Sequence, residues 1–131
     1  MHVAVPLAGY TTHRLLRASA RTRVYEAERD RDHKRVVAKV FELGDESVEA
    51  RVEHEFRLLQ ELELEGVVQA LGLERAGRQI VLLLEYVHGH NLSEEADGAP
   101  MGVARFLPRA LSMAEILTRI HARRVRISAM L

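Results

Sequence analysis

The alternation of hydrophobic and polar residues changes its period along this chain of 131 residues. Short stretches rich in β-branched and apolar residues, bounded by charged or glycine-containing turns, predict strands. We expect five strands, at residues 10–16, 24–28, 35–41, 67–74 and 79–87. A four-residue turn that contains Gly77 joins the last two, and such a short connection is typical of a hairpin.

Two other stretches have the helical period. From Ser47 onward, apolar residues recur every three or four positions with charged residues between them. This stripe consists of Val48, Val52, Phe56, Leu59 and Leu62. Asp45 or Ser47 is expected to cap its start, and Gly66 lies just beyond its expected end. A second helix is predicted from Phe106 to about Arg123. Its apolar positions are Leu107, Ala110, Leu111, Ala114, Leu117 and Ile120.

The predicted order of elements indicates an α+β domain, with a five-stranded antiparallel sheet and one helix beside it. Residues 10–87 form its compact part. Residues 88–102, with glycines, a proline and acidic side chains, are expected to be a linker, and the further helix spans 103–125. The 131 residues are enough for one domain with a core and too few for two ordinary domains.

Composition narrows the class of protein. The 19 basic and 19 acidic residues cancel, so no electrostatic footprint for nucleic acid is expected. No cysteine is present, which excludes disulfides and thiolate metal sites. The longest apolar run, residues 80–84, is too short to cross a bilayer, and the N-terminus does not have the pattern of a signal peptide. We therefore expect a soluble cytoplasmic protein with no membrane partner.

Lys39 ends an apolar run of β-branched residues, where a buried ammonium group would need a partner. Glu55 follows sixteen residues later in the predicted helix and supplies a carboxylate. This arrangement resembles the small lobe of a bacterial serine/threonine-type protein kinase, in which a strand lysine holds nucleotide phosphates and pairs with a helix glutamate. The resemblance covers residues 10–125 and includes the stretches 55–62, 82–87 and 117–125. It is closest to the kinase-like domains of large bacterial signalling proteins.

The resemblance assigns a role to several residues. Lys39 would contact the α- and β-phosphates of ATP, and Glu55 would hold Lys39 in place. Val24 and Ala38 would cover one face of the adenine. Leu84 would lie behind the adenine at the gatekeeper position. The backbone groups of Glu85 and Val87 would form hydrogen bonds with its edge.

The loop that covers the phosphates departs from the family pattern. The family needs glycines there so that backbone N–H groups can approach the phosphates. Arg17, Ser19 and Thr22 occupy the three glycine positions of this chain. Arg21 would offer a compensating positive charge. The sequence therefore predicts weak ATP contact at most.

The end of the chain departs further, because the resemblance stops between Val125 and Arg126. Ala129 stands where the family has its catalytic aspartate, and the metal-binding asparagine and aspartate have no counterpart, so no Mg²⁺ ligands are present. We expect no phosphoryl transfer from this chain alone. A natural partial kinase, a reading-frame change and a truncated gene model all remain open.

Three functional alternatives follow. The first is a partial kinase-like domain with weak ATP contact. The second is a nucleotide-independent interaction module, a pseudokinase fragment that binds a partner protein. The third is a small lobe completed by a separate large lobe. The stripe of the final helix favours self-association or a protein partner. The pair His88 and His90 lacks a third ligand of fixed spacing, so no metal site is expected.

Overall fold

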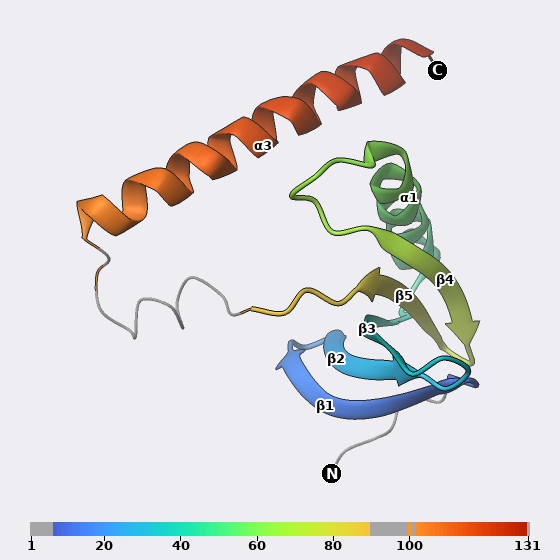
Figure 1. Cartoon of the computed structure of the whole chain (residues 1–131). Coiled ribbons are helices and arrows are strands. Elements are labelled where there is room, and N and C mark those ends of the chain that lie inside the picture. Colours follow the sequence, from blue (N-terminus) through green and yellow to red (C-terminus); the bar gives the residue numbers. More distant parts are fainter. Residues whose placement is uncertain (1–6, 90–99, 101, 131) are drawn as a thin grey trace. The chain divides into compact units, whose positions relative to one another are not determined.

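The computed structural model describes residues 7–89, 100 and 102–130, with the side chains of the last helix described as far as Arg123. Five strands and two helices have defined bounds within this part of the chain (Figure 1). They are β1 (Tyr10–Ala18), β2 (Thr22–Arg29), β3 (Lys34–Glu42), α1 (Glu46–Leu62), β4 (Ala70–Ala76), β5 (Gln79–Glu85) and α3 (Val103–Met130). In this part of the chain neither helix is both long enough and apolar enough to span a membrane.

The five strands form one antiparallel sheet in the order β1-β2-β3-β5-β4. The α+β class and the five-stranded antiparallel sheet predicted from the sequence are therefore confirmed. β3 lies in the middle, paired with β2 on one side and with β5 on the other. The hairpin between β4 and β5 turns at Gly77, whose φ of 61° favours a residue without a side chain.

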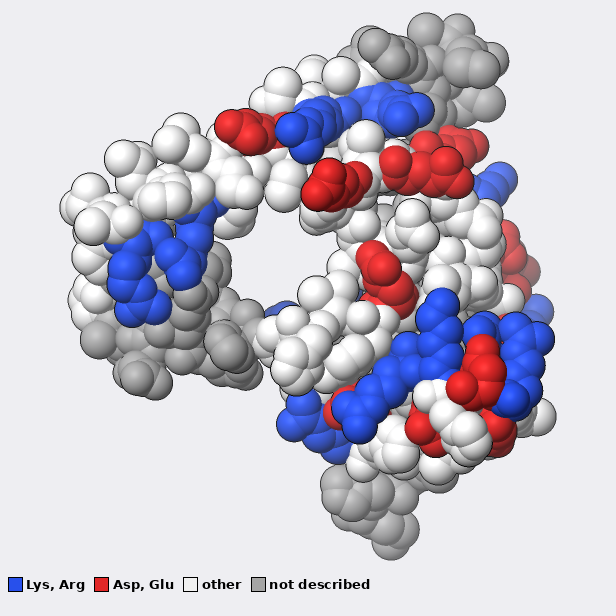
Figure 2. All heavy atoms as spheres, viewed as in Figure 1, with Lys and Arg blue, Asp and Glu red and all other residues white. Residues whose placement is uncertain are grey.

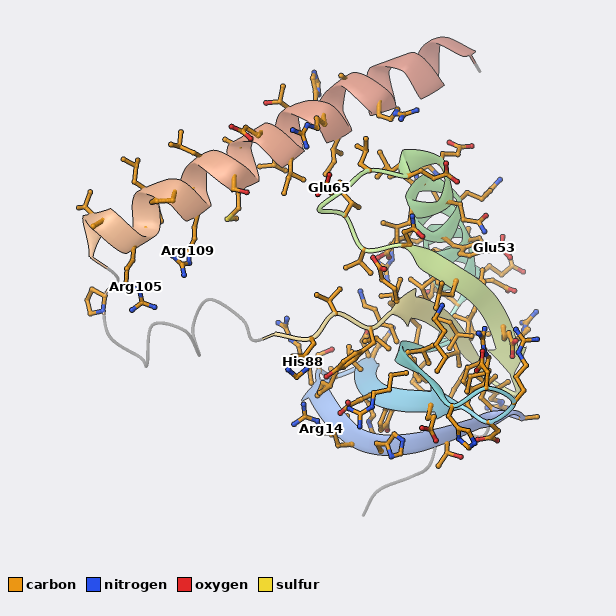
Figure 3. All side chains as sticks on the ribbon, in the orientation of Figure 1. Arg14, Glu53, Glu65, His88, Arg105 and Arg109 are labelled. Carbon is orange, nitrogen blue, oxygen red and sulfur yellow. The ribbon has the colours of Figure 1, made fainter. Side chains whose placement is uncertain are left out.

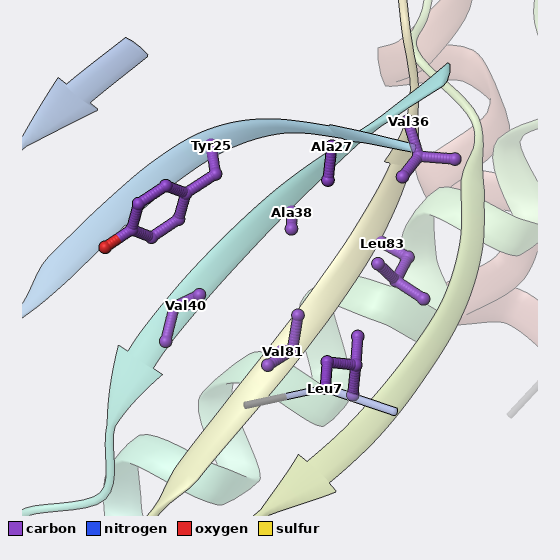
Figure 4. Packing of buried hydrophobic residues seen from close by; sticks show 8 residues of the cluster. All are labelled: Leu7, Tyr25, Ala27, Val36, Ala38, Val40, Val81 and Leu83. Carbon is purple, nitrogen blue, oxygen red and sulfur yellow. The ribbon is translucent and has the colours of Figure 1, made fainter. Parts of the chain in front are cut away.

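The two faces of the sheet bury two separate apolar clusters, because successive side chains of a strand point to opposite faces. One cluster gathers alternate residues of β2, β3 and β5 together with Leu7 (Figure 4). The other joins Phe41 and Leu82 of the sheet to Val48 and Val52 of α1. The apolar stripe predicted for the first helix therefore packs against the sheet, with Phe56 and Leu59 at the edge of this cluster.

Asp45 caps the start of α1. Its Oδ1 accepts hydrogen bonds from the backbone N–H groups of Ser47, at 2.8 Å, and of Val48, at 3.3 Å. The Ser47 hydroxyl donates to the same oxygen. These bonds, the Ser47 hydroxyl first, lower the pKa of Asp45, and the nearby Arg21 adds to the effect. Of the two residues that the sequence offered, Asp45 is the cap.

The described residues divide into two compact units. The first comprises the residues up to 61 together with residues 68–86, and the second comprises residues 62–67 and those from 87 onward. Within the second unit, the turn after α1 contacts α3. A Cβ atom on Gly66 would lie 2.7 Å from Cδ1 of Ile116, and Gly66 has a φ of 88°. Both the conformation and the contact favour glycine at this position.

Several boundaries differ from the sequence-based expectation. β1 and β2 extend further into their connection, which contains only residues 19–21. β4 begins at Ala70 rather than at residue 67, because residues 63–69 form a turn in which Glu63 and Gly66 have positive φ values. α3 continues to Met130, beyond its expected end at residue 125, with Pro108 inside it. Most of the predicted linker, residues 90–99 and 101, lies outside the described residues.

Candidate functional site

The face of the sheet that carries Lys39 is defined by the pairing of the strands. Lys39 lies opposite Val24 of β2 and opposite Leu82 of β5, and directly paired residues point to the same face. Val37 and Leu84 form the next pair on this face. Because Leu82 and Leu84 belong to the cluster around α1, Lys39 emerges from the same side of the sheet as that helix.

The ammonium group of Lys39 lies next to the carboxylate of Glu55. The distance from Nζ of Lys39 to Oε1 of Glu55 is 3.8 Å, so the structure brings together the two residues that the sequence paired. Nζ also lies 5.2 Å from the centre of the Phe41 ring, within the range of a cation–π contact. Both charged side chains remain partly accessible to solvent. The ammonium is therefore held in position and can still meet a ligand.

The placement of Ala38 on this face needs correction. Ala38 is 2% exposed and belongs to the cluster on the opposite face, next to Val36 and Val40 (Figure 4). Adjacent residues in a strand cannot share a face, so a role beside Lys39 is excluded by the period of two. Val37, two residues before Lys39, lies on the face assigned to Ala38. The alternation of faces within β3 was the signal in the sequence that places Val37, and not Ala38, on the face of Lys39.

The segment at the end of β5 contains the other predicted contacts. Leu84 is half-buried at the edge of the cluster that α1 covers. The backbone of Glu85 is fixed, since its N–H donates to the carbonyl of Gln69 at 3.0 Å, and its Oε1 accepts from the Gln69 N–H at 3.0 Å. Val87 is 61% exposed and belongs to the second unit.

The connection between β1 and β2 closes on itself. The Ser19 N–H donates to the carbonyl of Thr22 at 2.8 Å, and the Ser19 hydroxyl donates to the same oxygen at 3.3 Å. This backbone N–H is therefore already engaged and would have to leave its partner to reach a phosphate. Arg17 is the third side chain at a family glycine position, and it lies in β1 opposite Val24.

Arg21 also faces a different group from the one that the sequence suggested. Its carbonyl accepts from the Glu42 N–H at 3.1 Å. Its Nη1 would lie 3.2 Å from a Cβ atom on Gly44, so the guanidinium lies against the connection between β3 and α1. The positive charge there helps to lower the pKa of Asp45. Arg21 thus supports the start of α1 in this structure.

Sequence reasoning missed an ionic cluster formed by side chains of β1, β2 and β3. Glu26 is 4% exposed and accepts two charged hydrogen bonds, one from Nε of Arg14 and one from Nη1 of Arg35, each at 2.7 Å. The Arg14 hydrogen bond is the largest of the effects that lower the pKa of Glu26, Arg35 acts in the same direction, and burial opposes both. Basic and acidic side chains lie next to one another in this part of the molecule (Figure 2).

This cluster lies on the same face of the sheet as Lys39. Glu26 lies opposite Val37, and the guanidinium of Arg35 lies 5.8 Å from the centre of the Tyr86 ring. The ion pairs therefore connect β1, β2 and β3 close to the end of β5. The sequence signal was a glutamate inside a strand with arginines in both neighbouring strands, which marks a cross-strand ion pair.

Two further predicted positions can be placed only in part. Ala129 lies in the last turns of α3, where only the backbone is described. His90 lies outside the described residues, so the structure describes only His88 of the His88 and His90 pair. Among the described residues, no group of three histidine, aspartate or glutamate side chains is arranged to hold a metal ion.

A hollow of about 670 Å³ lies elsewhere in the first unit. It is lined by residues at the start of β1, the turn after β2 and strand β4, together with Leu83. Leu83 belongs to the cluster on the face opposite Lys39. This hollow is therefore separate from the predicted nucleotide face.

No model of a protein family matches the sequence, and no curated protein matches it either. The fold does match solved structures. A cysteine-to-alanine mutant of the Mycobacterium tuberculosis PknI kinase domain superimposes with a TM-score of 0.75 at 25% sequence identity, over 94% of this chain and 53% of that one. The PknI kinase domain without this mutation gives a TM-score of 0.71 at 23% identity, over 94% of this chain and 52% of that one.

These matches confirm the resemblance to a protein kinase small lobe at the level of the fold. The chain spans about half the length of the kinase domains that it matches.

Proposed function

We propose that this chain, which has the fold of the N-terminal part of a protein kinase domain, makes a weak contact with ATP through Lys39. The observation that carries the proposal is the distance of 3.8 Å between Nζ of Lys39 and Oε1 of Glu55. A positioned ammonium group that solvent can still reach is suited to the phosphates of a nucleotide.

The apolar face beside Lys39 supports a place for the adenine. Val24, Val37 and Leu84 lie on this face, and their side chains are half-buried. We propose that they cover one side of the base and that the backbone of Glu85 meets its edge. Only one side of the base would be covered by these residues, so half of the apolar burial of an enclosed site is not available.

We expect a dissociation constant on the order of 1 mM, which corresponds to about −4 kcal/mol. The closed β1–β2 connection is a second reason for low affinity, because the Ser19 N–H is already bonded to the carbonyl of Thr22. The 131 residues contain no His-Arg-Asp segment and no metal-binding pair of the family type, so we propose that these residues alone do not transfer the phosphate.

The test is a titration with Mg-ATP followed by calorimetry and by thermal unfolding. The chain contains two lysines, at the start and near the end of β3, and this gives a matched pair of variants. We expect Lys39→Ala to abolish the binding signal and Lys34→Ala to retain it. Equal binding by both variants would contradict the proposal. Absence of binding by the unmodified chain would favour the alternative, a nucleotide-independent interaction module.

A further inference from the structure

The apolar residues of α3 follow a heptad repeat. Val103, Ala110 and Leu117 are seven residues apart, and so are Phe106, Met113 and Ile120. The two series are offset by three residues, which is the spacing of the a and d positions of a coiled coil over three heptads. We call these six residues the α3 seam. A strict repeat of seven is typical of a helix that packs along another helix.

Most of the α3 seam is uncovered. Val103 is 76% exposed and Leu117 is 62% exposed, and more than half of Phe106 and Met113 is also accessible. Leu107, which flanks the seam, is exposed as well. Large contiguous apolar surfaces are uncommon on stable monomers and mark interaction sites.

The arginines of α3 lie to one side of the seam, and none of them is at a seam position. Arg105 and Arg109 project from the same side of the helix (Figure 3). Arg119 and Arg123 continue this side by the helical period, and Pro108 occupies the position opposite the seam. A partner helix can therefore contact the six seam residues without contacting the proline, and the arginines remain at the edge of the interface.

We propose that the α3 seam pairs with the α3 seam of a second copy of this chain, as a parallel two-stranded coiled coil. Neither Arg nor Glu occupies an a or d position between residues 103 and 120. Covering the seam and Leu107 on two copies buries an area on the order of 1,200 Å², at which specific interfaces begin. The only other helix with described bounds, α1, already buries its apolar stripe against the sheet.

The charges beside the seam favour the parallel arrangement. Arg109 and Arg123 are at g positions, and the e positions hold Leu107, Ala114 and His121. In an antiparallel pair that overlaps along the whole of α3, the g positions of the two helices face each other, so Arg109 would meet Arg123 of the second copy. In a parallel pair each g position faces an e position, and Arg109 would meet an alanine. Like charges are thereby kept apart.

Sedimentation equilibrium of the full chain over a range of concentrations tests the pairing. We expect a shift from one copy to two as the concentration rises. Leu117→Glu changes the seam and should weaken the pairing at least about tenfold. Leu111→Glu is the matched control, since Leu111 is similarly exposed but lies outside the seam, and we expect less than about a twofold change. Both residues are exposed, so neither variant should prevent folding, and circular dichroism checks this.

The orientation has its own test, because the chain contains no cysteine of its own. Under mild oxidation, Val103→Cys should form a disulfide between copies, since equivalent a positions of a parallel pair lie within disulfide range. Ala104→Cys, one residue outside the seam, should remain largely reduced. A chain that stays monomeric at all concentrations overturns the proposal. If such a monomer sediments together with anionic vesicles, the seam binds a membrane surface, and the proposal is overturned as well. A dimer that is equally weakened by both glutamate variants, or that leaves Val103→Cys reduced, also overturns it.

Discussion

Glu55 of α1 holds the ammonium group of Lys39 at 3.8 Å, next to the ring of Phe41. An ion pair with this degree of exposure contributes only about 0–1 kcal/mol to stability. Its position is therefore set by the packing of α1 on the sheet, where Val52 is completely buried. We interpret the pair as a feature that orients Lys39, with a small effect on folding.

Glu55→Gln should separate these two roles. We expect the free energy of unfolding to change by less than about 1 kcal/mol, while the affinity for Mg-ATP falls several-fold because Lys39 loses its orienting partner. Calorimetry and chemical denaturation measure the two quantities. Glu53→Gln is the control, because Glu53 is exposed on the same helix (Figure 3). Equal loss of affinity in both variants would show that the effect is one of overall charge.

Glu26 should make the stability of the sheet depend on pH. Its pKa is lowered in the folded state by Arg14 and Arg35, so the stabilising contribution is present above the unfolded-state pKa, near 4.5. This contribution is lost as the pH falls through the lower folded-state pKa. We expect Glu26→Gln to cost about 1–3 kcal/mol at pH 7 and less at pH 3. Thermal unfolding across this range measures it, and a cost that is independent of pH would contradict the assignment.

Gly66→Ala should destabilise the turn between α1 and β4 by about 1–2 kcal/mol from the left-handed conformation, with an added cost from Ile116. Gly77→Ala is the control, since Gly77 also has a positive φ but a Cβ atom there would meet nothing within 4 Å. Denaturant unfolding compares the two variants. In an Ile116→Val background, which removes Cδ1, the added cost of Gly66→Ala should decrease. An unchanged cost would show that the contact with α3 is unimportant.

The purified chain should not transfer phosphate to itself or to a protein substrate. The reason is that Ala129 stands where protein kinases have the catalytic aspartate. The metal-binding residues of that family also have no counterpart in the sequence. Incubation with labelled ATP and Mg²⁺ measures this. Incorporation that persists through purification and disappears in Lys39→Ala would contradict the expectation.

The order of elements could be predicted from the sequence because each element has a clear period. The repeat in α1 and the apolar run of β5 identified both their type and their place in the fold. The start of β4 could not be predicted, since Val67 and Val68 look like strand residues until the turn at Glu63 and Gly66 is known.

The candidate site was predicted in part. The pairing of Lys39 with Glu55 followed from the family resemblance, whereas Ala38 was placed on the wrong face of β3 although the period of two excludes it. The burial of Glu26 could not be derived from β2 alone, because a glutamate in a strand normally faces solvent. Only the pairing of β2 with β1 and β3 brings both arginines to it.

Labelling with an acyl phosphate of ATP tests the central claim most directly. In this reaction a lysine amine attacks the acyl carbonyl, forms an amide and releases ATP, so the lysine nearest the phosphates is marked. Mass spectrometry then compares Lys39 with Lys34, the other lysine of the chain. We predict preferential labelling of Lys39 that millimolar Mg-ATP suppresses and Glu55→Gln reduces. Equal labelling of the two lysines without protection by ATP would contradict a nucleotide site at Lys39.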